Sequence, residues 1–155
     1  MSLPFYETEK ENAVIGYLSL NGFAEIENYA RTRPESFTHP LASVMFEAAQ
    51  YIHRKGRTPN TLTIIEAIEA DRTLKRIATD AATEAGLPDW KDYIYCADTS
   101  IARGQIIGEY LADITEAAGR RKAFQIYDKG KAGEISVAEA VEALAEIQGN
   151  GAAQK

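Results

Sequence analysis

The sequence predicts an all-α protein, a six-helix globular bundle followed by a long helical hairpin. Along nearly the whole chain, apolar residues recur every three or four positions, which is the period of one buried helix face. No stretch alternates apolar and polar residues between hairpin turns, as a half-buried strand does. The 155 residues, 45% hydrophobic and 26% charged, suffice for one folded domain with its own core. Three residue pairs also have the spacing of helix capping boxes, namely Thr8 with Glu11, Thr63 with Glu66, and Ser136 with Glu139.

The globular bundle is expected to occupy residues 1–98. Its segments are separated by helix-ending or helix-starting residues, such as Gly22 and Gly56 at helix ends and Pro40 in a first helical turn. The six helices are predicted over residues 8–20, 23–29, 40–55, 62–68, 73–85 and 88–96.

The helical hairpin is expected to occupy residues 99–148. Its first arm covers residues 100–127, and at about 1.5 Å per residue this arm is a rod of about 40 Å. The turn is predicted at residues 128–133, where the sequence reads Asp-Lys-Gly-Lys-Ala-Gly. Residues 149–155 are expected to be a flexible tail or the start of a linker.

The apolar stripe of the hairpin predicts self-association. For any single residue an intramolecular core explains the pattern, but a two-helix hairpin has little core of its own. An apolar seam wider than one partner helix needs is covered most simply by another copy of the chain. The candidate interface residues are Ile107, Tyr110, Leu111, Ile114, Phe124, Val141 and Leu144.

Basic residues collect near the hairpin turn of a chain whose net charge is −6. Cations near a helix C-terminus are usually solvated and favour the helix dipole. The alternatives are an acidic patch on a partner or the backbone of passing DNA, although the acidic chain as a whole predicts only weak DNA contact. The candidate residues are Arg120, Arg121, Lys122, Lys129 and Lys131.

The sequence indicates no catalytic, cofactor-binding or metal-binding residues. It lacks the Gly-x4-Gly-Lys-Ser/Thr spacing of a phosphate-binding loop, so ATP hydrolysis by this chain alone is not expected. The only histidines, His39 and His53, have no second ligand at metal-binding spacing. Cys96 is predicted to be a small buried residue, and Trp90 is predicted to be an aromatic that closes the bundle rather than an exposed anchor.

The same sequence predicts a cytoplasmic protein. Residues 1–5 lack the basic and apolar regions of a secretory signal, and no apolar run approaches the roughly 20 residues that span a bilayer. A single cysteine, which cannot form an internal disulfide, is typical of a reducing compartment.

Four segments, taken in order, resemble the N-terminal domain of DnaB-type replicative DNA helicases. The first is Glu11-Asn12-Ala13-Val14-Ile15-Gly16-Tyr17-Leu18, which is similar to the family's E-x-A-V-L-G-x-L helix. The second is Ser36-Phe37 with Val44-Met45-Phe46-Glu47-Ala48, which is similar to its D-F-Y and I-F-E-A segments. The third is Gly56 with Thr61-Leu62-Thr63-Ile64, which is similar to its G-x-P-V-D-L-V-T-V segment, and the fourth is Tyr110 with Arg120-Arg121-Lys122. The resemblance covers residues 7–147. Ala42 stands where the family often has His, and Thr38 stands where it has Tyr, so the chain resembles a divergent member, such as one encoded by a phage or prophage.

The resemblance implies an assembly and docking role in the primosome. In that family the hairpins pair into dimers, three dimers form a collar on the hexameric motor, and the collar receives primase while helicase loaders contact the helicase. ATP and Mg²⁺ belong to a separate motor domain. The function expected here is therefore a non-catalytic helicase domain that mediates oligomerisation and primase or loader binding. The alternative is a stand-alone phage helicase loader, adaptor or inhibitor with the same fold, and the complete gene would distinguish it from a helicase domain. A third hypothesis, an enzyme that acts alone, has little support in the sequence.

Overall fold

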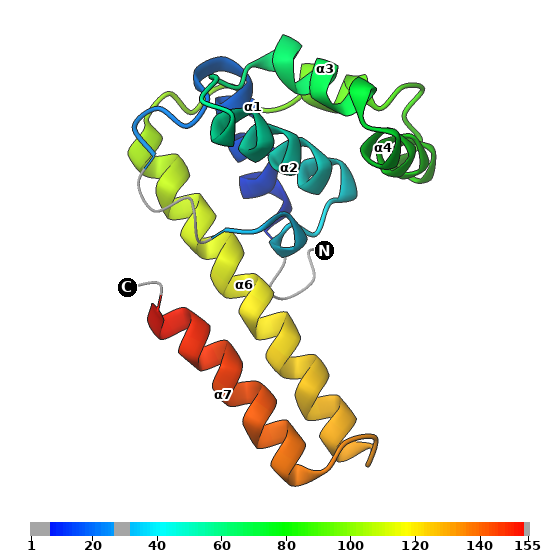
Figure 1. Cartoon of the computed structure of the whole chain (residues 1–155), viewed down its shortest axis with the longest axis vertical. Coiled ribbons are helices and arrows are strands. Elements are labelled where there is room, and N and C mark those ends of the chain that lie inside the picture. The colour runs from blue at the N-terminus through cyan, green and yellow to red at the C-terminus, as the bar shows by residue number, and fades with distance from the viewer. Residues whose placement is uncertain (1–6, 27–31, 154–155) are drawn as a thin grey trace.

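The structure, a computed structural model, describes residues 7–26 and 32–153, and over these residues it is helical with no strand (Figure 1). The predicted all-α fold is confirmed. The elements are α1 (Thr8–Asn21), the 3-10 helix η2 (Pro34–Ser36), α2 (Pro40–Arg54), α3 (Thr61–Ala70), α4 (Arg72–Ala85), α5 (Lys91–Tyr95), α6 (Gly104–Lys131) and α7 (Val137–Ala153).

The core of the bundle lies between α1, α2, α3 and the first half of α6. Leu18, Phe46 and Ile64 are fully buried there, and Phe37 packs against Phe46 with their ring centroids 4.7 Å apart. Figure 1 shows α6 starting against the bundle and then running past it, with α7 folded back along the projecting half. The core therefore continues into α6, beyond the loop at residue 98 where the bundle was expected to end.

One of the three predicted capping boxes forms at the start of a helix. Ser136 and Glu139 do form a capping box, since Glu139 N donates to Ser136 Oγ at 3.1 Å and Ser136 N donates to the Glu139 carboxylate at 3.2 Å. The prediction for Thr63 was wrong because Asn60, three residues earlier, forms a reciprocal pair with it at 2.8 and 2.9 Å. Glu11 is not a capping residue either, because its carboxylate points to another element.

Several predicted boundaries differ from the structure. Residues 23–26 form a turn rather than a helix, and residues 27–29 lie outside the described residues. Helix α6 continues to Lys131, through the predicted turn, and the turn follows at Gly133, whose φ is +77°. Helix α7 continues to Ala153, so most of the expected flexible tail is helical. None of the helices within the described ranges is long and apolar enough to cross a membrane.

Candidate interaction surface on the helical hairpin

Three of the predicted interface residues are core residues of the single chain. Ile107, Leu111 and Ile114 are at most 1% exposed, because the first half of α6 packs on α1 and closes the bundle. Their assignment to a self-association surface was wrong. The apolar stripe of α6 is continuous in sequence, but only its second half projects beyond the bundle. Tyr110 is half-buried at the junction, beneath the Lys10 ammonium, which lies 5.7 Å from the ring centroid.

The two arms of the hairpin pack through small residues. A Cβ atom added to Gly119 would lie 3.7 Å from Cγ2 of Ile147, and one added to Gly130 would lie 3.7 Å from Cβ of Ala140. These pairs identify the row of each helix that faces the other. Ile126 lies in the same row of α6 and is 9% exposed.

Five large apolar side chains are left exposed on the arms. The exposed fractions are 56% for Phe124, 62% for Tyr127, 80% for Val137, 62% for Val141 and 39% for Leu144. Phe124 and Tyr127 are three residues apart on α6, and the other three follow i, i+4, i+7 spacing on α7, so each set forms one row. Sequence reasoning missed Tyr127 and Val137, although both continue the spacing of residues it selected.

Both rows lie on the same side of the hairpin. Successive residues of a helix are rotated by about 100° around its axis, and each exposed row lies roughly a quarter of a turn from the row that contacts the other arm. In both helices this rotation is in the direction of increasing residue number. Because the helices are antiparallel, the two exposed rows then lie on the same side of the pair. We call this surface the outer apolar face; its residues are Phe124, Tyr127, Val137, Val141 and Leu144.

The opposite side of the hairpin is charged. The same geometry places Lys122 and Lys129 of α6 beside Glu139 and Glu146 of α7, and all four are exposed. The large exposed apolar side chains therefore lie on one side of the hairpin, where Arg120 and Lys131 continue the row of Phe124 and Tyr127 on α6, and lysines and glutamates lie on the other side.

The predicted basic cluster is divided among several sides of α6. Arg120 forms an ion pair with Glu116 at 2.6 Å, whereas Arg121 donates to the carbonyl oxygen of Ser36 at 2.9 Å and so ties α6 to η2. Lys131 follows Arg120 at the spacing of one face, away from Lys122 and Lys129 on the charged side. The five cations do not form one patch, and any role in partner or DNA contact stays a prediction.

An ion-pair network lies where the hairpin leaves the bundle. The ammonium of Lys10 contacts Asp113 at 2.7 Å and Glu7 at 3.3 Å, and together with Glu116 and Arg120 these groups line a polar surface pocket. The hydrogen bond from Lys10 to Asp113 raises the pKa of the ammonium. Because the side chains are partly exposed, this network orients α6 on α1 more than it stabilises the fold.

A buried carboxylate joins α1 to the start of α2. Glu11 is 1% exposed, and its oxygens accept hydrogen bonds from Thr38 N at 2.9 Å, Thr38 Oγ1 at 2.7 Å and His39 N at 2.9 Å. The neighbouring His39 ring lies 4.7 Å from Tyr93, and the Tyr93 hydroxyl donates to Oδ1 of Asn12. Burial raises the pKa of Tyr93, and the nearby Glu11 charge adds to the effect. These acid and base groups bind one another and the backbone, so the cluster is structural.

The His39 imidazole couples the stability of this cluster to pH. Its Nδ1 accepts from Leu41 N at 3.2 Å, and burial lowers its pKa below the usual 6.5 although Glu11 opposes the shift. Folding thus favours the neutral ring, and the unfolded chain takes up the proton first as the pH falls.

We therefore expect the free energy of unfolding to fall as the pH drops below about 6.5, and His39→Gln to weaken that dependence. Urea titrations at neutral pH and at about pH 5 measure both effects. An identical pH dependence in the two proteins would contradict this role of His39.

The remaining candidate residues have structural surroundings. Trp90 is 5% exposed and packs in the core, which confirms its predicted role in the bundle. Cys96 is exposed, so its predicted burial was wrong; it follows the last turn of α5. His53 is exposed at the end of α2, and its ring lies 5.0 Å from Phe23. Within the described part of the chain, no three His, Cys, Asp or Glu side chains are grouped as a metal site would require.

Comparison with known proteins identifies the family. The model of the DnaB-like helicase N-terminal domain matches residues 3–89, which is more than half of the chain. The crystal structure of the N-terminal domain of DnaB helicase from Mycobacterium tuberculosis has the same fold, with a TM-score of 0.65 and 21% sequence identity over 94% of this chain and 99% of that one. No curated protein matches the chain in sequence. The chain thus belongs to the family of DnaB-like helicase N-terminal domains, which are proteins of DNA replication.

Proposed function

We propose that this chain is the non-catalytic assembly and docking domain of a replicative helicase, and that it pairs with a second copy through the outer apolar face. The observation that supports the proposal most directly is the exposure of five large apolar side chains, from 39% to 80%, on one side of a projecting hairpin. A contiguous apolar surface with polar surroundings is typical of an interaction site.

Burial of the outer apolar face favours association, and symmetry makes a second hairpin the simplest partner. Fully burying a Val, Leu or Phe side chain contributes about 1.5 to 3 kcal/mol, so covering this row offsets much of the entropic cost of association. When two copies are related by a two-fold axis, the outer apolar face of one copy can cover the same face of the other, and the same residues contribute from both copies. The antiparallel packing of α6 against α7 suits that geometry.

Pairing of hairpins leaves the bundles available for other contacts. Three such dimers would form a ring, and the bundle surfaces would receive a primase or a helicase loader. ATP and Mg²⁺ would act in a separate motor domain rather than on this chain. In this account the domain contributes to DNA unwinding by holding subunits and partners together.

Val141→Glu tests the pairing. A carboxylate at the centre of the outer apolar face would lose its hydration in the dimer, so we expect the dimer to weaken at least about tenfold. Gln125→Glu adds the same charge at an exposed position on another side of α6 and should leave the dimer intact. Multi-angle light scattering across a micromolar concentration series measures the two masses. Equal masses for the two variants would contradict pairing through this face.

A further inference from the structure

A second surface lies at the opposite end of the molecule from the hairpin turn. Helix α2 ends at Arg54, and the loop that follows it lies by the end of α1 at the top of the bundle (Figure 1). The sequence here reads His53-Arg54-Lys55-Gly56-Arg57, and all five residues are exposed. This loop is therefore a concentrated basic segment in a chain of net charge −6.

The three strong cations at the end of α2 and in the loop after it have no acidic partner among the described residues. Over residues 7–26 and 32–153, Arg54, Lys55 and Arg57 form no ion pair. A cation at a helix C-terminus favours the dipole, which accounts for Arg54 and Lys55. It does not account for Arg57, which lies beyond the helix and three residues before Asn60, where the positive end of α3 begins.

The backbone that carries these cations is fixed. Gly56 has φ of +78°, and Arg57 N donates to the carbonyl oxygen of Ile52 at 3.2 Å, which is the pattern of a Schellman helix end. On the other side, Gly22 packs against the loop, since a Cβ there would lie 3.0 Å from Cγ2 of Thr58. The backbone positions of the three cations are thus fixed relative to one another, which lowers the entropic cost of binding an anionic ligand.

An aromatic ring accompanies the cations. Tyr51 lies one turn before Lys55 on α2 and is 52% exposed, and the Lys55 ammonium lies 5.5 Å from its ring centroid. An exposed aromatic beside a run of cations is the combination that binds single-stranded nucleic acid, with phosphates on the cations and an unpaired base on the ring. An acidic peptide would use the cations but would have no base to stack on the tyrosine.

We propose that Tyr51, Arg54, Lys55 and Arg57 form a contact site for single-stranded nucleic acid, the basic loop site. The phosphodiester backbone lies along the three cations, and one base stacks on Tyr51. The site is independent of hairpin pairing because it lies at the other end of the bundle.

The cations are tested by the salt dependence of binding. The probe is a fluorescein-labelled oligothymidylate of about 15 nucleotides, and its fluorescence anisotropy is followed as the full chain is added at several salt concentrations. Replacing Arg54, Lys55 and Arg57 with glutamine should weaken binding at low salt at least about tenfold and reduce the salt slope by about 2, since each contact to a single strand contributes about 0.7.

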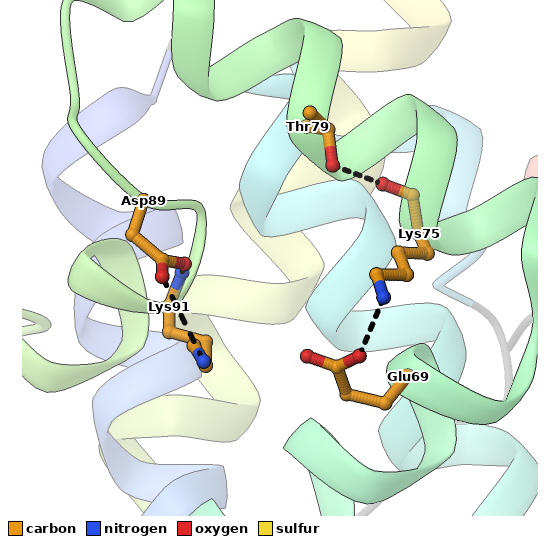
Figure 2. Close-up of polar contacts among 5 residues, drawn as sticks. All are labelled: Glu69, Lys75, Thr79, Asp89 and Lys91. Atoms are coloured by element: carbon orange, nitrogen blue, oxygen red, sulfur yellow. Dashed lines mark hydrogen bonds and ion pairs between the residues drawn. The ribbon is translucent and has the colours of Figure 1, made fainter.

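Helix α4 offers a matched control with the same change of charge. Arg72, Lys75 and Arg76 are also exposed, but the Lys75 ammonium is paired with Glu69 at 2.9 Å (Figure 2). Replacing these three residues with glutamine should change the affinity less than about twofold. If the two triple variants lower the affinity for oligothymidylate equally, the affinity depends only on the net charge of the chain, and the proposal fails.

The ring is tested separately from the charge. Tyr51→Leu should lower the affinity for oligothymidylate at least about fivefold with an unchanged salt slope, whereas Tyr51→Phe should bind like the original chain. Tyr95→Leu, at an exposed tyrosine of α5, is the control and should have no effect. A Tyr51→Leu variant with unchanged affinity for oligothymidylate would overturn the proposal. So would polyglutamate that displaces the oligonucleotide at the same concentration of negative charge as unlabelled oligothymidylate, because the site would then bind any acidic partner.

Discussion

Replacing Glu11 with alanine is expected to lower the free energy of unfolding by about 3 to 5 kcal/mol. The carboxylate is buried and accepts hydrogen bonds from two backbone amides and one hydroxyl at the start of α2. Its removal leaves the half-buried donors of Thr38 and His39 without their acceptor, and it opens a cavity between α1 and α2. Urea denaturation followed by circular dichroism measures the loss.

Glu9 provides the control for this substitution. It lies in the first turn of the same helix and is exposed, so Glu9→Ala should cost no more than about 1 kcal/mol. Glu11→Gln should fall between the two, because the amide keeps one acceptor but turns an NH₂ group toward the donors. If Glu11→Ala and Glu9→Ala unfold at the same urea concentration, the buried carboxylate does not join the helices as described.

Replacing Gly16 with alanine is expected to cost at least about 3 kcal/mol or to prevent folding. A Cβ at this position of α1 would lie 1.8 Å from the carbonyl oxygen of Asp98 and 2.5 Å from its carbonyl carbon. The obstacle is backbone, so no side-chain rotation relieves it, and α1 must move away from the segment that leads into α6. A thermal melt of the variant measures the loss.

Gly119→Ala is the matched control. Gly119 also lies within a helix, but its added Cβ would lie 3.7 Å from Ile147 Cγ2, an ordinary packing distance. Because alanine favours a helix more than glycine does, this variant should gain up to about 1 kcal/mol. Opposite signs for the two substitutions are therefore expected, and a Gly16→Ala protein as stable as the original would show that α1 does not approach residue 98 so closely.

Local signals in the sequence predicted much of the fold. The helix predicted over residues 40–55 is observed as Pro40–Arg54, with proline in its first turn, and the Ser136 capping box forms as expected. Such features depend on residues a few positions apart, so the sequence alone reveals them. The partner of Glu11 lies 27 residues away, and its local spacing to Thr8 gave the wrong interpretation.

The candidate surface was only partly predictable for a similar reason. The apolar spacing of α6 is the same along its length, but Ile107 meets the bundle and Phe124 does not. Periodicity reports that a helix face is apolar and does not report which neighbour covers it. On α7, two of the residues proposed for the interface, Val141 and Leu144, are exposed, but Val137 of the same row was not among them, and their pairing with a second copy stays a prediction.

Sedimentation equilibrium of the unaltered chain, from low to high micromolar concentration, tests the pairing of hairpins most directly. If the outer apolar face joins two copies, the fitted mass rises to twice the 17.0 kDa of one chain within that range. A mass of 17.0 kDa at every concentration would contradict the account, because the exposed residues of α6 and α7 would then remain in contact with water.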